Sequence, residues 1–133
     1  MSYFHFEKSW WEVRTTPNVL MVHYNDLKSD LSTEMRRIAD FLAISVPAEL
    51  WPQLVAAAGF EAMRRDGDAL MASLATIFKD GSRSFIFKGT NERWRGVAAE
   101  EDLAIYEAKA EAMLSPACAR WVARGPVQAG DPR

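Results

Sequence analysis

The residues best suited to binding chemistry are a lysine and a glycine, Lys88-Gly89, which directly follow the run Phe85-Ile86-Phe87. A lysine supplies a compact positive charge, and a glycine lets backbone N–H groups come close to an anion. A Lys-Gly pair is common in loops, so by itself it does not predict a site. Because the net charge of the chain is −2, anion binding would need a local group of basic residues.

Candidates for acid–base or nucleophilic catalysis are scarce, because the chain has two histidines and one cysteine. His5 lies in the first predicted helix and His23 on a predicted strand, and we interpret both as structural. The 133 residues contain no glycine-rich loop ending in Lys-Ser or Lys-Thr, the usual cradle for nucleotide phosphates. Cys118 alone cannot form an internal disulfide, which fits a reducing, intracellular setting. We therefore predict no catalytic residue.

Helical spacing of apolar residues dominates the chain and must position these groups. Helices are predicted over 3–14, 31–43, 47–58 with Pro47 as the first helical residue, and 100–114, with a last helix ending at about residue 124. The inward face expected for the helix over 100–114 consists of Leu103, Tyr106, Ala110 and Met113. Residues 60–65 are predicted as a short turn or helix, 66–84 as mostly loop with a helical turn near 70–74, and 125–133 as a flexible tail.

One apolar run departs from the helical pattern. Val19-Leu20-Met21-Val22, followed by His23-Tyr24 and a turn at Asn25-Asp26, is short and bounded by helix breakers. Such a run predicts a strand buried on both faces. A lone strand cannot satisfy its backbone hydrogen bonds, so partner strands are expected elsewhere. The expected fold is therefore mostly α, with one principal strand over 19–24, and forms part of a larger structure.

Composition limits the classes of function. With 49% hydrophobic and 26% charged residues, the chain can build a core, and its length allows one small domain. No apolar run approaches the roughly 20 residues that cross a bilayer, and no secretory signal is visible, so we expect a cytoplasmic protein without a membrane partner. Arg64-Arg65 and Arg93–Arg95 are few and mixed with acids, which argues against a nucleic-acid partner.

Four short segments are more informative for their order than singly. The segment Ser9-Trp10-Trp11-Glu12 resembles the "WW" helix of the cytosolic-type sulfotransferases, and residues 23–42 resemble that family's "YEDLKKD"–"IRRIAEFL" stretch. Residues 58–63 are similar to its "TSFxxM" segment, and residues 85–95 to its "FxRKGxxGDWK" signature. The resemblance covers nearly the whole chain. It implies that residues 1–124 are the C-terminal segment of a P-loop-type α/β domain with a parallel sheet.

The resemblance also implies a ligand and a reaction. The family transfers a sulfuryl group from 3′-phosphoadenosine 5′-phosphosulfate (PAPS) to a hydroxyl or amine, without a metal. By position, Phe60, Met63 and Tyr24 would contact the adenine, and aromatic and sulfur side chains suit such stacking. Lys88-Gly89 would hold the 3′-phosphate. Phe85 and Phe87 belong by position to the same nucleotide-binding set.

The chain departs from the family pattern at several of these positions. Phe87 stands where the family has an arginine, which removes a forked phosphate donor. Glu92 replaces the second glycine, Arg93 replaces an aspartate, and Ala58-Gly59 replaces Thr-Ser. The family's 5′-phosphosulfate loop and general-base histidine are missing from these residues. We therefore expect an incomplete nucleotide site that is inactive alone.

An alternative function needs no chemistry. The chain could be a helical interaction or dimerisation module derived from a sulfotransferase, because the predicted strand and the aromatic face of Phe4, Trp10 and Trp11 must be covered. Either self-association or a missing N-terminal half would cover them. Binding of 3′,5′-adenosine bisphosphate separates the two functions, since only the first requires it.

Overall fold

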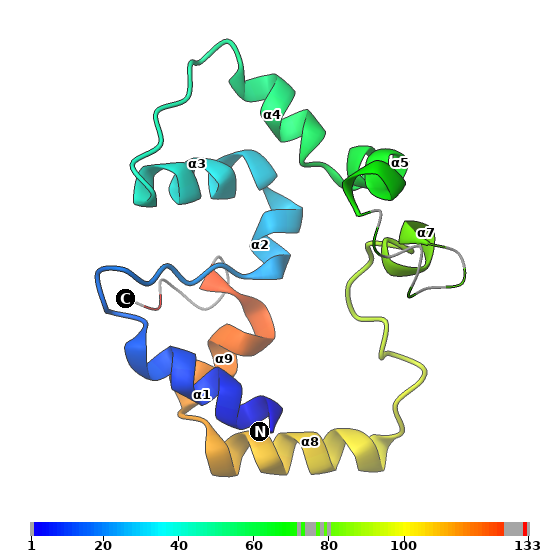
Figure 1. Cartoon of the computed structure of the whole chain (residues 1–133). Coiled ribbons are helices and arrows are strands. Elements are labelled where there is room, and N and C mark those ends of the chain that lie inside the picture. Colours follow the sequence, from blue (N-terminus) through cyan, green and yellow to red (C-terminus); the bar gives the residue numbers. More distant parts are fainter. Residues whose placement is uncertain are drawn as a thin grey trace. The chain divides into compact units, whose positions relative to one another are not determined.

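A computed structural model describes residues 2–71, 73, 77, 79, 81–126 and 132. The described chain is mostly helical and divides into two compact units, Met1–Phe41 with Glu92–Arg133, and Leu42–Asn91 (Figure 1). The helices of the first unit are α1 (Tyr3–Val13), α2 (Tyr24–Ser29), α3 (Leu31–Phe41), α8 (Glu100–Met113) and α9 (Pro116–Arg124). Those of the second unit are α4 (Trp51–Ala57), α5 (Phe60–Leu70) and α7 (Ser82–Phe85). None of these helices is long and apolar enough to cross a membrane.

Polar side chains at their N-termini fix several helix starts in the first unit. The Ser2 hydroxyl accepts the N–H of His5 at the start of α1, and the Ser115 hydroxyl accepts that of Cys118 at the start of α9. The Asp30 carboxylate accepts both the backbone N–H and the hydroxyl of Thr33 before α3. Each bond satisfies a donor that the first helical turn leaves without a partner.

The core of the first unit lies where α1, α8 and α9 meet (Figure 1). Phe4, Leu114 and Cys118 are buried there, with Trp11 packed against them. The predicted aromatic helix is confirmed, but only its Phe4–Trp11 face enters the core. Phe6, Trp10 and Val13 are 49%, 46% and 42% exposed. The helix α1 therefore presents a second aromatic face that its own unit does not bury.

The predicted strand is not confirmed. Residues 19–23 belong to no regular element, and no strand occurs among the described residues. Tyr24, predicted as the end of the strand, begins α2, which continues through Asn25-Asp26, where a turn was predicted. A strand is defined by its ladder partner, and the described part of the chain provides none for this run. The residue pattern is that of a strand, but the hydrogen bonds that would make it one are absent here.

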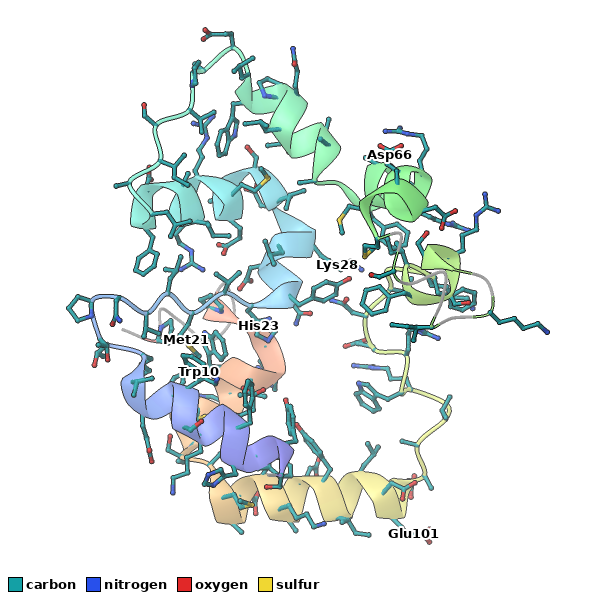
Figure 2. The ribbon with its side chains drawn as sticks, in the orientation of Figure 1. Trp10, Met21, His23, Lys28, Asp66 and Glu101 are labelled. Atoms are coloured by element: carbon teal, nitrogen blue, oxygen red, sulfur yellow. The ribbon has the colours of Figure 1, made fainter. Side chains whose placement is uncertain are left out.

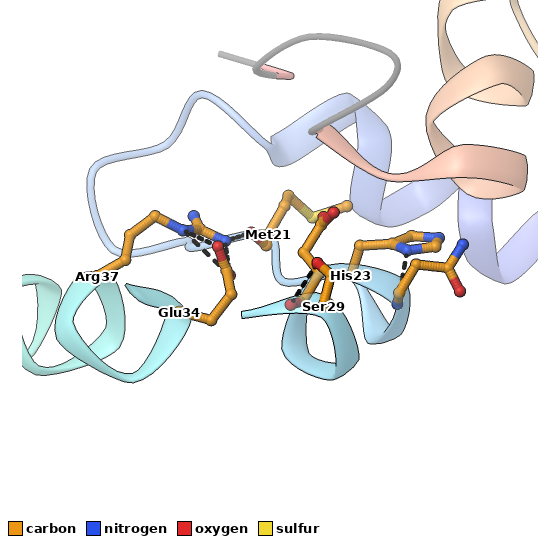
Figure 3. A network of polar contacts seen from close by, with 7 residues as sticks. Met21, His23, Ser29, Glu34 and Arg37 are labelled. Atoms are coloured by element: carbon orange, nitrogen blue, oxygen red, sulfur yellow. Dashed lines mark hydrogen bonds and ion pairs between the residues drawn. The ribbon is translucent and has the colours of Figure 1, made fainter. Parts of the chain in front are cut away.

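Side chains, in place of a ladder, hold residues 19–23 (Figure 3). The guanidinium of Arg37 donates to the carbonyl of Met21 at 2.8 Å and forms an ion pair with Glu34 at 2.7 Å. Glu34 is 7% exposed, so the pair compensates a carboxylate that would be costly to bury alone. A single arginine thereby connects the extended run to α3.

The predicted helix over 47–58 starts later than expected, at Trp51. Residues 47–50 form a turn in which the N–H of Leu50 donates to the carbonyl of Pro47. Starting at Trp51 places Pro52 in the first helical turn, where no N–H is needed. A helix from Pro47 would have put Pro52 in its interior, with a lost hydrogen bond and a steric clash.

The prediction of a loop over 66–84 is wrong at both ends. Helix α5 continues to Leu70, and Ser82–Phe85 form α7. Gly67, which suggested a loop, lies inside α5. A glycine suits this position because α7 approaches it closely: a methyl group at Gly67 would lie 2.7 Å from the Ser82 hydroxyl oxygen. The Asp68 carboxylate accepts both the N–H and the hydroxyl of Ser82. Of the helical turn predicted near 70–74, Leu70 instead ends α5 and Met71 follows as its C-cap, whereas residues 72 and 74 lie outside the described residues.

The remaining predictions concern the C-terminal region. Helix α8 is confirmed, but its predicted inward face is only partly so: Leu103 and Ala110 are partly buried, whereas Tyr106 and Met113 are exposed. Helix α9 ends at the predicted position. Most of the predicted tail lies outside the described residues, although the carbonyl of Pro132 accepts a hydrogen bond from Arg14 at 2.6 Å.

We predict that Gly67→Ala lowers stability, although alanine ordinarily stabilises a helix interior by about 1 kcal/mol over glycine. The added methyl would crowd Ser82, which is 1% exposed, so we expect a net loss of about 1–3 kcal/mol. Chemical denaturation followed by circular dichroism measures it. Arg64→Ala, at an exposed position of the same helix, is the control and should be nearly neutral. A higher unfolding midpoint for Gly67→Ala would contradict the α5–α7 contact.

Candidate functional site

Two predicted site residues from different segments meet in the second unit. Gly89 adopts φ +59°, and a methyl group there would lie 2.7 Å from two carbons of the Phe60 ring. Phe60 is the first residue of α5. The positive φ and the covering ring both require glycine at this position. The contact therefore brings the basic turn and the predicted adenine-stacking aromatic into one place.

Lys88 presents its charge beside this contact. The residue is exposed, and its ammonium lies 5.1 Å from the centre of the Phe87 ring. A cation over an aromatic face at an exposed site gains about 0.5–1 kcal/mol, which a phosphate could readily outweigh. Phe87 is 49% exposed and Phe85 64%, so both rings border the turn at the surface. The turn can therefore offer a ligand the exposed Lys88 ammonium and the apolar rings of Phe85 and Phe87.

The other two predicted residues have different positions. Met63 lies one turn after Phe60 on α5 and is 41% exposed. Its side chain is therefore accessible to a ligand that contacts this helix. Tyr24 belongs to the first unit, where it begins α2 and is 56% exposed. The second unit therefore brings together Phe60, Met63, Phe85, Phe87, Lys88 and Gly89, and Tyr24 is not part of it.

Glu92 has the backbone conformation of the glycine that it replaces. Its φ is +58°, one of two positive values among the described non-glycine residues. Its carboxylate forms an ion pair with Arg95 at 2.8 Å, and the Arg95 guanidinium lies 5.4 Å from the centre of the Trp94 ring. The negative charge of Glu92 is therefore balanced locally. A carboxylate beside a phosphate is unfavourable, and this ion pair reduces that repulsion.

The structural interpretation of His23 is confirmed. Its Nδ1 accepts the N–H of Asn25, and its Nε2 lies 3.0 Å from the carbonyl oxygen of Val122, to which it can donate. Both ring nitrogens are thereby used by the backbone, which leaves none for a substrate proton. His5 is exposed on α1. Within the described ranges, no three His, Cys, Asp or Glu side chains gather as a metal site requires.

The comparisons with known proteins agree with the motif order. Residues 1–111 match the model of the sulfotransferase domain family. The chain belongs to the sulfotransferase family. It is 32% identical to sulfotransferase 1A1 of Rattus norvegicus over 95 residues, which are 71% of this chain and 33% of the relative. It is 31% identical to sulfotransferase 1A1 of Mus musculus over 112 residues, 81% of this chain and 38% of the relative.

A more distant relative gives the same result. Luciferin sulfotransferase of Photinus pyralis is 29% identical over 105 residues, 75% of this chain and 28% of the relative. No solved structure matches the chain. The chain spans about a third of the length of these sulfotransferases, so the match identifies the family and places the chain on one part of it.

Two features of the structure were not predicted from sequence. A cavity of about 600 Å³ in the first unit lies along α1, residues 18–24 and α9, and includes Glu7 among aromatic side chains. A smaller hollow of about 280 Å³ in the second unit is lined by Glu61, Arg64, Arg65 and Arg83. The aromatic spacing on α1 was a usable signal for the first cavity. Helix α7 was not predicted, so nothing in the sequence placed Arg83 beside α5.

We predict that Gly89→Ala destabilises the second unit through both the backbone and the Phe60 ring. The left-handed conformation alone costs a non-glycine residue about 1–2 kcal/mol, and the ring contact adds to it. In a Phe60→Ala background the cost of Gly89→Ala should fall to the backbone part. Thermal unfolding of the four proteins in this double-mutant cycle measures the difference. Additive effects would mean that ring and glycine are not in contact.

Proposed function

We propose that this chain supplies the adenine and 3′-phosphate side of a PAPS site in a sulfotransferase. The observation that carries the proposal is the contact between Phe60 and the Gly89 turn, which sets an aromatic ring beside an exposed lysine. A nucleotide with a 3′-phosphate combines a flat base with a negatively charged phosphate. The base can stack on the aromatic ring, and the phosphate can pair with the lysine. Family membership supports the choice of a nucleotide sulfate donor.

The adenine would contact Phe60 and Met63, which share α5. The 3′-phosphate would meet the Lys88 ammonium and the backbone N–H groups at Gly89, with Phe85 and Phe87 at the rim. With Phe87 in place of an arginine, one forked donor is missing, and a charge-assisted hydrogen bond contributes about 1.5–3 kcal/mol. We therefore expect weaker nucleotide affinity than in a sulfotransferase that retains the arginine.

The reaction proposed for the complete site is transfer of the sulfuryl group to a hydroxyl or amine of an acceptor, with no metal. Within this chain no described side chain is placed to act as the general base, since His23 is occupied by backbone groups. Charge developing in the transition state also needs donors on the 5′-phosphosulfate side. The proposed role of these residues is therefore binding, and the chain is incomplete for catalysis.

Binding of 3′,5′-adenosine bisphosphate should depend on Lys88 and Phe60 for different physical reasons. Lys88→Ala should lower affinity at least about tenfold and flatten its salt dependence, because a charge contact is lost. Phe60→Leu, which keeps an apolar contact for Gly89, should lower affinity with an unchanged salt slope, because stacking is not charge-driven. Calorimetry at two ionic strengths measures both, with Lys79→Ala as the control for a lysine elsewhere in the same unit. Equal slopes for the two variants would show that the roles are wrongly assigned.

The proposal also predicts that this chain alone has no turnover. The 133-residue chain should transfer no sulfuryl group from radiolabelled PAPS to any member of a panel of phenols, alcohols and amines. The reason is the missing phosphosulfate loop and general base. A full-length sulfotransferase serves as the positive control. Product above background that disappears when the protein is heated would contradict the proposal that these residues only bind.

A second candidate function is a non-enzymatic interaction or dimerisation module. It is favoured by the exposed aromatic face of α1, where Tyr3 is 51%, Phe6 49% and Trp10 46% exposed. Such a patch often marks a contact surface. The nucleotide titration above separates the candidates, because an interaction module requires no affinity for 3′,5′-adenosine bisphosphate.

A further inference from the structure

One cavity of the first unit is formed by elements distant in sequence. Its lining comes from one face of α1, from residues 18–24 and from the end of α9, and its volume is about 600 Å³. Sites for small organic molecules commonly measure about 300–1,000 Å³. In Figure 2, Trp10 of α1 lies near Met21 and His23, which both belong to the segment 18–24. Tyr24 also borders the cavity, whereas the six residues of the proposed nucleotide site do not.

Aromatic side chains supply much of the apolar lining. Tyr3, Phe6 and Trp10 follow each other along one face of α1 at spacings of three and four residues, and Trp121 faces them from α9. The Phe6 and Trp10 rings meet edge to face at 6.3 Å. Phe6 and Trp10 are nearly half exposed, so part of each ring remains available to a ligand. Aromatic faces carry partial negative charge and attract cations.

Glu7 is the acidic residue of this lining. It lies on α1 between Phe6 and Trp10 and is partly buried. Among the described residues, no hydrogen bond or ion pair to its carboxylate is found, whereas Glu12 on the same helix pairs with Lys8. Burial raises the pKa of Glu7, and the nearby His23 opposes that shift. No lysine or arginine is among the residues that line the cavity with Glu7.

We propose that this cavity binds an organic ammonium ion, with its cationic head between the Glu7 carboxylate and the aromatic rings of α1 and its apolar body along residues 19–22. Aromatic cages that include a carboxylate combine cation–π attraction with a direct charge contact. The ligand is held without a transfer step. This function is separate from nucleotide binding.

Glu7 also decides between a cation and an apolar protein surface as the occupant. A second copy of the chain that covered the α1 face would bury the Glu7 carboxylate without a partner, which is costly. An ammonium ion removes that cost because it supplies the missing positive charge. The position of Glu7 within an otherwise aromatic and aliphatic lining therefore favours the small cation.

The experiment compares two isosteric probes, 2-phenylethylammonium chloride and 2-phenylethanol, by calorimetry and by shifts of amide signals of the ¹⁵N-labelled full chain at neutral pH. The ammonium should bind about tenfold more tightly than the alcohol, and amides of α1 and residues 19–23 should shift. Benzyltrimethylammonium, which cannot donate a hydrogen bond, should also bind, because its charge is retained.

Two variants locate the effect. Glu7→Gln should remove the preference for the cation and leave alcohol binding unchanged, and Trp10→Leu should weaken the cation more than the alcohol. The matched control is Glu12→Gln, which removes the same charge from an exposed position on α1 and should leave the preference intact. Circular dichroism checks that each variant is folded.

Three outcomes would overturn the proposal. Equal affinity for the ammonium and the alcohol would exclude recognition of charge. Equal losses from Glu7→Gln and Glu12→Gln would show that only the net charge matters. Binding of neither probe, together with a dimer in sedimentation velocity, would show that a second copy occupies the α1 face instead.

Discussion

Within the first unit, the imidazole of His23 joins α2 to α9 through two backbone contacts and one ring contact. Its Nδ1 starts α2, its Nε2 meets the Val122 carbonyl 99 positions away in sequence, and its ring lies edge-on to Trp121 at 5.3 Å. Gly125, at φ +77°, ends α9 so close to this ring that a methyl group would lie 2.7 Å from Nδ1. The same contacts that order α9 against residues 19–24 also form the wall of the cavity and keep this histidine from acting as a base.

The second unit depends in a comparable way on α5. Its first residue, Phe60, covers Gly89, and near its end Gly67 lets Ser82 pack against the helix. The two contacts fix both ends of the segment 82–89. The hydrogen bonds from Ser82 to the Asp68 carboxylate strengthen the contact at the first end. The position of Lys88 is thus set by two close packing contacts, Gly67 with Ser82 and Gly89 with Phe60. Its ammonium lies 5.1 Å from the centre of the Phe87 ring, an attraction that an anion could outweigh.

Local rules predicted the parts of this structure that local energetics decide. Helical periodicity predicted α1 and α9, and motif order predicted that Phe60 and Gly89 share one site, where the structure has them in contact. The failures have a different origin. Gly67 resembles a loop residue in the sequence because its place in a helix depends on Ser82, 15 positions later. A helix starting at Pro47 is incompatible with Pro52, which would lie in its interior. The run 19–23 has strand composition, but a strand also needs hydrogen bonds from a neighbour that no local pattern contains.

The departures from the family pattern become easier to interpret once the backbone is known. Gly89 adopts a left-handed conformation, and Glu92 adopts one too, at a position where the family motif has glycine. Backbone shape at both places is therefore that of glycine, although one side chain has changed to a carboxylate that Arg95 neutralises. At position 87, by contrast, a guanidinium has been exchanged for a ring that attracts the neighbouring lysine. A framework that could bring N–H groups to a phosphate is retained while one charged donor is lost. For this reason the nucleotide affinity that we propose would depend strongly on Lys88.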